Sequence, residues 1–256
     1  MTKFSKIPIS TTIALLLPLA AEKKIFVSLL PKEFKQRFGF TECSTEKSIR
    51  SSVHMLRSEK LMLRLVISVS GMGKVLAAAT TQQLIDCYTP NLLLHIGSAG
   101  AIDDTPIGCM VLAEKIIEHD YYSHPAPKPN FAPPSHLLQM CHTMTSNATT
   151  SIKNAILTGT ILSGTENIFS TQRRDELRQE FSTMKSPLAV DWESSAVAQI
   201  CSLTKTPYLV LRAITDTAAS NSLTEFTYNF KPCLTTLSIT TFNIMKTWLD
   251  NNTPQS

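Results

Sequence analysis

The feature of this chain that most constrains its fold is a long apolar run, residues 207–216, that ends in an acid. Strands that are apolar along their whole length are buried on both faces, as in a sheet that helices cover on each side. Ligands of such sheets bind at the carboxyl ends of the strands. The run therefore predicts an α/β sheet, and it places Arg212 and Asp216 where a binding site is expected.

Three earlier runs share this design. Residues 13–17, 63–69 and 91–96 are apolar, and each leads into small or polar residues. Two of the following segments, 70–74 and 97–100, contain glycines. Glycine lacks a Cβ, so we expect the backbone to approach a ligand closely at these strand ends. The repeated pattern predicts one pocket assembled from several strand ends.

A second acidic motif, residues 190–198, precedes the last of these strands. Its Glu193 stands at the start of a predicted helix, whose apolar residues recur at helical spacing. Acids at helix starts and aspartates after strands are also common as capping and turn residues. Each acid taken alone therefore has a structural explanation, and their combination is what points to a functional site.

Other segments fill in an alternating α/β pattern. We expect three further helices, of which the second is polar and faces solvent. We also expect a loop where prolines cluster, because proline sustains neither a helix nor a strand. Such a loop within one domain can serve as a lid or a subunit contact. The helices are predicted at 75–87, 171–182 and 230–249, and the loop at 124–134.

In its order of motifs the chain resembles the nucleoside phosphorylase superfamily, and within it the 5'-methylthioadenosine/S-adenosylhomocysteine nucleosidases and their futalosine-hydrolase relatives. The resemblance implies a three-layer α/β fold with a central mixed β-sheet flanked by helices, in a single domain over residues 1–256. No single motif is specific, but the ordered set is. The matching segments are residues 13–22, 70–79, 97–102, 108–120, 162–168, 190–198 and 212–216.

Composition agrees with this interpretation. The 256 residues are enough for one substantial core. The net charge of +4 is modest, and the basic residues are scattered, so no nucleic-acid footprint is evident. Six cysteines without paired spacing are typical of buried thiols in a reducing compartment.

The N-terminus imitates a secretory signal, because Lys3 and Lys6 precede the apolar stretch 13–19 and the small residues Ala20 and Ala21. Against that reading, the stretch is short and contains a proline, and it ends at a glutamate that the family needs. No run is long enough to span a bilayer. We therefore expect a cytoplasmic protein, with flexible ends at residues 1–12 and 250–256.

Several other catalytic motifs do not fit. Residues 71–74 lack the upstream glycine and the following Ser or Thr of a phosphate-binding loop. Residues 97–100 lack the first glycine of a nucleophile elbow. His119, Asp120 and His124 match no common metal-ligand spacing, so we expect a hydrogen-bonded strand end there. The sequence predicts no metal and no cofactor.

The resemblance implies a role for each of four charged residues. Cleavage of the N-glycosidic bond needs an acid that protonates the departing base, and Asp216 matches it. Glu193 would bind the ribose hydroxyls and stabilise the cationic sugar. Glu22 would activate the attacking water, and Arg212 would position Glu22 or that water.

The same resemblance implies the residues that contact the substrate. Three of them depart from the family's pattern: Asn167 replaces an aromatic that stacks on adenine, and Asp191 and Trp192 replace a Glu-Met pair at the sugar. Ala20 and Ala21 also replace two acids. The implied contacts are Leu19, Ser98, Ala99, Gly100, Asn167, Ile168, Asp191 and Trp192.

These features leave three classes of function open. The first is an adenine-releasing nucleosidase that acts on methylthioadenosine, adenosylhomocysteine, or futalosine and its 6-amino form in menaquinone synthesis. The second is a purine nucleoside phosphorylase, and the third is a catalytically dead nucleoside-binding protein. The first strand ends in residues 18–22, without the glycine or arginine of a phosphate cradle, so hydrolysis is favoured. We expect a homodimer that binds a small nucleoside, but neither nucleic acid nor membrane.

Overall fold

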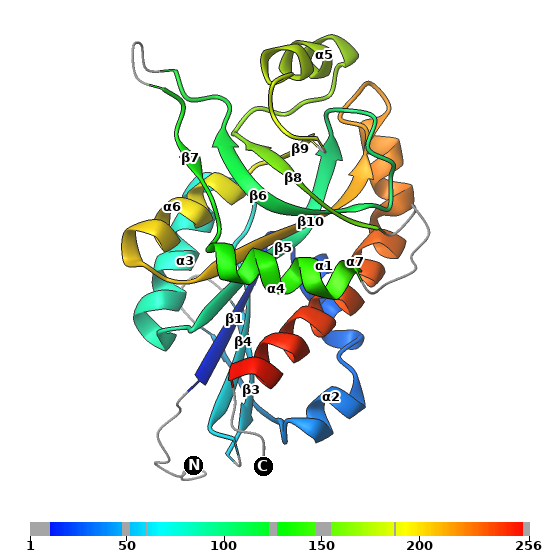
Figure 1. The fold of residues 1–256 in the computed structure, drawn as a ribbon. Coiled ribbons are helices and arrows are strands. Elements are labelled where there is room, and N and C mark those ends of the chain that lie inside the picture. Colours follow the sequence, from blue (N-terminus) through cyan, green and yellow to red (C-terminus); the bar gives the residue numbers. More distant parts are fainter. Residues whose placement is uncertain are drawn as a thin grey trace.

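A computed structural model describes residues 11–47, 52–59, 61–122, 127–146, 155–186 and 188–252. The chain alternates strands and helices in the predicted manner (Figure 1). The strands are β1 Thr11–Leu17, β2 Thr41–Lys47, β3 Ser52–Ser58, β4 Leu63–Val69, β5 Leu92–Ala101, β6 Met110–Glu118, β7 Asn130–Phe131, β8 Ile156–Ser163, β9 Leu188–Asp191 and β10 Tyr208–Asp216. The helices are α1 Ala20–Ser28, α2 Lys32–Arg37, α3 Lys74–Tyr88, α4 Ser135–Ser146, α5 Thr171–Glu180, α6 Ser194–Thr204 and α7 Ser222–Asn252.

The described strands form one 10-stranded mixed sheet in the order β10-β6-β8-β9-β5-β1-β4-β3-β2, with β7 beside β6. Strand β10 also pairs with β5, so β5, β10, β6, β8 and β9 close into a ring. Strands β4, β1, β5 and β10 are mutually parallel, so their carboxyl ends meet at one edge. The central mixed sheet predicted from the sequence is confirmed.

Helices cover both faces of this sheet, which makes three layers (Figure 1). Helices α1, α4 and α7 pack on one face, and α3 and α6 lie together on the other. Strand β1 shows why: Ile13, Leu15 and Leu17 point into one core, while Ala14 and Leu16 point into the other. The predicted burial of this run on both faces is therefore confirmed.

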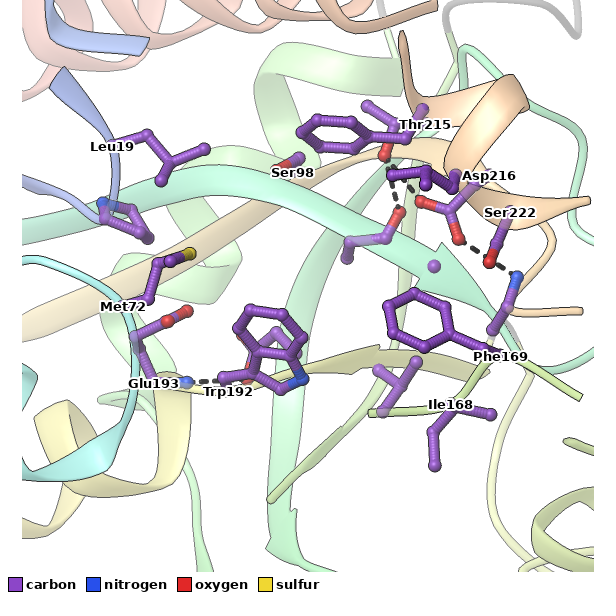
Figure 2. Close-up of a pocket in the computed structure, with 18 residues that line it drawn as sticks. Leu19, Met72, Ser98, Ile168, Phe169, Trp192, Glu193, Thr215, Asp216 and Ser222 are labelled. Carbon is purple, nitrogen blue, oxygen red and sulfur yellow. Dashed lines mark hydrogen bonds between the residues drawn. The ribbon is translucent and has the colours of Figure 1, made fainter. Parts of the chain in front are cut away.

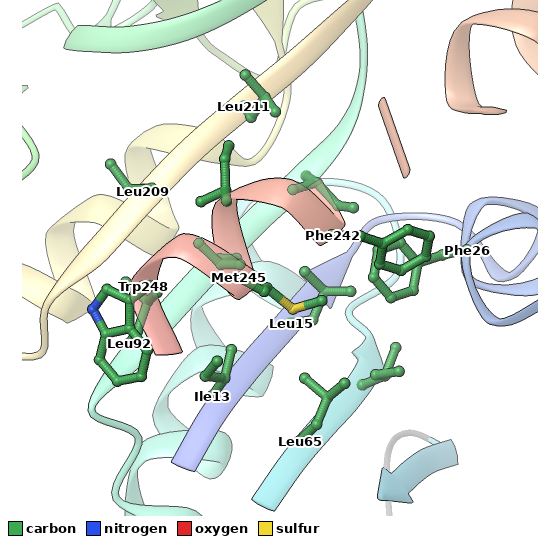
Figure 3. Close-up of a cluster of buried hydrophobic side chains, with 14 of the residues drawn as sticks. Ile13, Leu15, Phe26, Leu65, Leu92, Leu209, Leu211, Phe242, Met245 and Trp248 are labelled. Atoms are coloured by element: carbon green, nitrogen blue, oxygen red, sulfur yellow. The ribbon is translucent and has the colours of Figure 1, made fainter. Parts of the chain in front are cut away.

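The larger core joins the sheet to the C-terminal helix (Figure 3). Phe242 of α7 lies against Phe26 of α1, with ring centroids 4.6 Å apart, and Met245 and Trp248 continue the contact over the strands. This packing fixes α1 and α7 relative to the strand ends between them. Both helices carry residues of the candidate site described below.

Several predicted boundaries differ from the structure. Helix α5 ends at Glu180 rather than at residue 182, and residues 190 and 191 finish β9 instead of opening a helix. Helix α7 begins at Ser222 rather than at residue 230. Its first turns contain three threonines or serines and precede Pro232, a composition that is atypical of helices. Tertiary contacts outweigh that local preference: Glu225 accepts the Thr217 amide (2.8 Å), and the Asn229 side-chain amide donates to the Thr215 carbonyl (3.3 Å).

Two regular elements extend into the segments that the sequence predicted to be flexible. Strand β1 already begins at Thr11, and α7 continues through Asn252. Residues 1–10 and 253–256 lie outside the described residues. The apolar stretch that imitates a secretory signal forms a strand paired on both sides, with β4 and β5.

Two further sequence expectations concern membrane-spanning helices and thiols. In the described ranges, no helix has both the length and the apolar character that a membrane span requires. Cys109, Cys141, Cys201 and Cys233 are buried free thiols, as expected, whereas Cys87 is exposed. The side chain of Cys43 lies outside the described residues.

Candidate active site

A cavity of about 280 Å³ opens at the edge where the parallel strands end (Figure 2). Its wall comes from the last residues of β5, β9 and β10, from the segments that follow β1, β4, β8, β9 and β10, and from the first turns of α7. The single pocket predicted from the strand ends is therefore present. Nine of the predicted site residues line it: Leu19, Ser98, Ala99, Gly100, Ile168, Asp191, Trp192, Glu193 and Asp216.

Asp216 lies at the end of β10, on the opposite side of the cavity from Glu193 (Figure 2). Its Oδ1 accepts a hydrogen bond from the Ala218 amide (3.0 Å), and its Oδ2 accepts one from the Thr215 hydroxyl (2.9 Å). Both bonds favour the ionised form, yet burial dominates and raises the pKa of the carboxyl. Asp216 is thus a partly buried acid that faces the cavity and binds its proton more tightly than a free aspartic acid does.

Glu193 is the N-cap residue of α6, but its side chain does not cap that helix. Instead its Oε1 accepts a hydrogen bond from the Gly73 amide (2.8 Å), which anchors the carboxyl to the loop after β4. Burial raises the pKa of Glu193 to about 7. The Arg212 guanidinium opposes this rise, and the charges of Asp191 and Glu22 add to it. Glu193 can therefore change its charge near neutral pH.

Glu22 lies behind the cavity wall rather than in it. It stands in the first turn of α1, fully buried, where Oε2 accepts the Leu19 amide (2.9 Å). Its Oε1 accepts both the amide (3.0 Å) and the hydroxyl (3.1 Å) of Ser98. Burial is the largest influence and raises the pKa of the carboxyl, despite these hydrogen bonds and Arg212. Ser98 lines the cavity, so Glu22 lies directly beneath the wall.

Arg212 is also completely buried, and its main partner is Asp191. Its Nε donates to Asp191 Oδ2 (2.7 Å), and its Nη2 contacts His95 Nε2 and Ser194 Oγ (3.1 Å). Glu193 Oε2 is farther from Nη2, at 3.7 Å. Arg212 thus makes no direct hydrogen bond to Glu22 in the structure, although its charge acts on that carboxyl.

Asp191 lines the cavity, but protein groups already use both of its oxygens. Oδ1 accepts the backbone amides of Glu193 (3.3 Å) and Ser194 (3.1 Å), and Oδ2 accepts Arg212 and the Ser194 hydroxyl. Although burial acts against the charge, Arg212 holds the pKa of Asp191 below its usual range. Asp191 therefore organises the turn that presents Glu193.

His95, Asp191 and Glu193 offer ligand atoms close enough together to suggest a metal site. The Arg212 guanidinium lies among these three groups, so a cation already faces them. The other candidate cluster is also explained in part: Asp120 forms an ion pair with Lys74 (2.9 Å) and accepts the Thr165 amide.

The rest of that second cluster differs from expectation. The His119 side chain is buried, and its ring nitrogens make no hydrogen bond among the described residues, contrary to the expected hydrogen-bonded strand end. Its backbone carbonyl does accept a bond from Lys128. His124 lies outside the described residues.

Two glycines of β5 make room for charged side chains, and Gly100 also lines the cavity. A Cβ on Gly97 would lie 2.4 Å from Arg212 Nη1 and 3.1 Å from Glu22 Oε1. A Cβ on Gly100 would lie 2.9 Å from Asp216 Oδ1. The bare backbone of β5 is therefore what lets these charged groups gather at one strand end.

The expected contact from Asn167 is not supported, because this residue is exposed and lies outside the cavity wall. Phe169, two residues later, supplies an aromatic ring there instead (Figure 2). Sequence reasoning also missed Met72 after β4, and Leu223 and Phe226 at the start of α7. The three-residue spacing of Leu223 and Phe226 could have indicated a shared helix face, had the helix been predicted to begin there.

Comparisons with known proteins agree with this geometry. The family model described as phosphorylase superfamily matches residues 32–246. A 5'-methylthioadenosine/S-adenosylhomocysteine nucleosidase of Staphylococcus epidermidis is 32% identical over 175 residues, which are 63% of this chain and 73% of that protein.

Two solved structures from Helicobacter pylori have the same fold. One is a 5'-methylthioadenosine/S-adenosylhomocysteine nucleosidase in complex with a pyrrolidine ligand that carries an amino-pyrrolopyrimidine (TM-score 0.77, 20% identity, 93% of this chain and 99% of that one). The other is a futalosine hydrolase (TM-score 0.77, 20% identity, 94% and 98%).

The raised pKa of Glu193 predicts a specific dependence of stability on pH. The folded chain keeps a proton on this carboxyl between pH 4.5 and about 7, where the unfolded chain has lost it. Its contribution to the free energy of unfolding is therefore fully present below pH 4.5 and is lost as pH rises through about 7. Glu193→Gln, which retains an acceptor for Gly73, should be more stable than wild type at pH 8 by about 1–3 kcal/mol.

Urea unfolding of wild type and Glu193→Gln at pH 4, 6 and 8 measures this effect. Only the difference between the two proteins is informative, since Asp191 and His95, whose pKa values are lowered, act in the opposite sense in both. A difference that does not grow between pH 4 and pH 8 would contradict the prediction.

Proposed function

We propose that this chain, which belongs to the phosphorylase superfamily and within it to the 5'-methylthioadenosine/S-adenosylhomocysteine nucleosidases, uses Glu22, Glu193 and Asp216 to hydrolyse the N-glycosidic bond of a 5'-modified purine nucleoside. The chain is an N-ribosyl purine nucleosidase. The observation that carries the residue assignment is the placement of three carboxyls with raised pKa values around one cavity: Glu193 and Asp216 line it, and Glu22 lies directly behind its wall.

Asp216 is the proposed general acid. The base leaves with the bonding electrons, so it must be protonated as the bond breaks, and N7 is the exposed ring nitrogen that can take the proton. Burial raises the pKa of Asp216, which keeps a proton available for this transfer. The apolar wall around Ile168 and Phe169, on the Asp216 side of the cavity, suits a purine ring (Figure 2).

Glu193 is the proposed partner of the ribose. As the bond breaks, the sugar acquires oxocarbenium character and positive charge. A carboxyl whose pKa is about 7 ionises readily when a cation forms beside it. Its charge therefore stabilises the transition state more than the neutral substrate, which is the condition for catalysis.

Glu22 and Arg212 are the proposed groups around the attacking water. Arg212 Nη1 is buried without a hydrogen-bond partner, and both this atom and Glu22 Oε1 lie close to the Cα of Gly97. A water that accepts from Nη1 and donates to Glu22 would be oriented by both. Burial raises the pKa of Glu22, which makes its carboxylate a better base for the water proton.

The same groups disfavour phosphate as the nucleophile. The cavity wall in the described part of the chain contains no lysine or arginine, and the charge of Arg212 is paired with Asp191. A phosphate near Glu22 would face a carboxylate rather than a cradle of amides and arginines. The phosphorylase alternative therefore has less support than hydrolysis, and the intact set of acids argues against a dead binding protein.

Asp216→Asn should reduce base release by about 100- to 10,000-fold, the usual range for loss of a general acid. The variant retains the hydrogen-bonding shape of the side chain, so the fold should persist. Release of free base in single-turnover assays measures the effect, with Asp250→Asn at the far end of α7 as a surface control. Retention of a tenth of wild-type turnover or more would remove Asp216 from the proposed role.

The cavity also supports a proposal about the substrate. Its wall is apolar at Leu19, Met72, Leu223 and Phe226, and its ionisable residues are all acids in the described part of the chain. We therefore expect large neutral 5' groups to be accepted and anionic ones to be weaker substrates. We also expect adenine to be the base released, as the similarity to methylthioadenosine nucleosidases suggests. Hypoxanthine nucleosides should be clearly weaker substrates, because an unpaired donor or acceptor in a buried site costs more than a missing methylene.

A panel of nucleosides, each with and without phosphate, tests this proposal. 5'-Methylthioadenosine and 5'-ethylthioadenosine, which differ by one methylene, should have kcat/KM values within about 100-fold of each other, since a methylene-sized change is worth only about 1–3 kcal/mol. Adenosylhomocysteine and aminofutalosine add anionic groups, and futalosine changes the base. A preference for futalosine over aminofutalosine would contradict the adenine assignment, and an absolute need for phosphate would contradict hydrolysis.

We also propose that the chain works as a cytoplasmic homodimer. Met72, Val75 and Leu76 form an exposed apolar cluster beside the cavity, and Val75 is 82% exposed. Neighbouring apolar side chains of this kind mark interaction surfaces. A second copy placed there would cover the cluster and narrow the mouth of the cavity.

Sedimentation should therefore show a dimer that Val75→Asp weakens, because the partner would bury the new charge. Leu203→Asp, at an exposed apolar residue near the end of α6, is the matched control and should leave the dimer intact. If wild type sediments as a monomer at micromolar concentration, this part of the proposal is wrong.

A further inference from the structure

His95 has no role in the mechanism above, although it is one of the most deeply placed polar residues in the structure. It lies in the middle of β5, two residues before Gly97, with no exposed surface. Strand β1 pairs with it on one side, through Leu16, and β10 pairs with it on the other, through Val210. A buried polar ring at the centre of a sheet is costly unless both of its nitrogens are used.

Both nitrogens are used, and their partners fix the protonation of the ring. His95 Nδ1 lies 3.2 Å from the Leu16 carbonyl, which can only accept a hydrogen bond. His95 Nε2 contacts Arg212 Nη2, which can only donate. Nδ1 must therefore carry the proton, and Nε2 must offer its lone pair to the guanidinium. An acceptor at one nitrogen and a donor at the other therefore hold the ring in one neutral tautomer.

We propose that His95 is a positioning residue for base release: as a neutral acceptor, it holds the Arg212 guanidinium against Asp191 and away from Glu193. This inference rests on the nucleosidase function proposed above. The competing partner is close, since Glu193 Oε2 lies 3.7 Å from the same Nη2 that His95 engages. In the described structure, only His95 Nε2 and Ser194 Oγ accept hydrogen bonds from that nitrogen.

Neutrality is what makes histidine suited to this position. An acid at residue 95 would add a negative charge beside Arg212, Asp191 and Glu193, and it would cancel the field that Arg212 exerts on Glu193 and Glu22. The imidazole satisfies the guanidinium without changing the charge of the cluster. Burial, together with Arg212, lowers the pKa of His95 to about 3, so the ring stays neutral at every pH at which the enzyme is expected to work.

Removal of the acceptor should therefore affect catalysis through Arg212. In His95→Leu, Nη2 loses a partner and can turn toward Glu193, whose pKa then falls. We expect a kcat about 100-fold lower, as for other small displacements of catalytic geometry, with KM little changed. The acid limb of the kcat–pH profile should move to lower pH, because Arg212 is the largest influence that lowers the pKa of Glu193. A merely structural residue would not shift that limb.

His95→Gln is the matched variant, since its side-chain oxygen can occupy the place of Nε2 and accept from Arg212. It should restore most of the wild-type kcat and the wild-type pH profile, even where His95→Leu folds poorly. His136→Leu, at an exposed histidine on α4, is the surface control. A Gln variant as impaired as the Leu variant, or a Leu variant with the wild-type profile, would overturn the proposal.

Nitrogen-15 NMR of the imidazoles provides a readout that is independent of activity. The His95 signal, identified by its loss in His95→Gln, should show a neutral ring with the proton on Nδ1 between pH 5 and pH 8. A charged ring at pH 5, or a proton on Nε2, would overturn the inference about His95. Failure of the wild-type enzyme to release any base would instead overturn the proposed function.

Discussion

The architecture of this site depends on one buried ion pair, Arg212 with Asp191. A guanidinium without exposed surface is tolerable only if its charge is paired. The strand β10 brings Arg212 to the sheet edge, β9 brings Asp191 to meet it, and β5 contributes the backbone and the histidine beside them. Asp191 then accepts the first amides of α6 and so determines where Glu193 stands.

The close packing of these charged groups explains why the neighbouring strand β5 carries glycines beside them. Arg212 Nη1 and Glu22 Oε1 approach the same glycine, Gly97, and Asp216 Oδ1 approaches Gly100 so closely that a Cβ would clash. Strand β5 thus lacks side chains where two neighbouring elements, α1 and β10, insert theirs. The absence of side chains on β5 therefore shapes the pocket more than the side chains that β5 carries. Because β5 lies between β1 and β10, its glycines leave room for the charged side chains there.

The sequence was sufficient to predict what depends on local pattern. Apolar runs identified β1, β4, β5 and β10, and the residues after each run identified the pocket edge. It was insufficient where tertiary contacts decide. Phe169 replaces the contact expected from Asn167 because the loop after β8 turns the later residue inward, and a run such as 222–229 shows no helical preference of its own. The pairing of His95 with Arg212 joins strands far apart in the chain, and no spacing reveals it.

The contrast between Asp191 and Glu193 shows how the fold assigns different duties to two neighbouring acids. Both are buried beside the same guanidinium. Asp191 lies 2.7 Å from Arg212 Nε and also accepts amides of α6, so its pKa is lowered and it stays ionised. Glu193 is 3.7 Å away, so burial prevails and its pKa rises to about 7. A displacement of Glu193 toward Arg212 would lower the pKa of this carboxyl, and its charge would respond less to the forming cation. The distance between Arg212 and Glu193 is therefore as much a functional property as the identity of either residue.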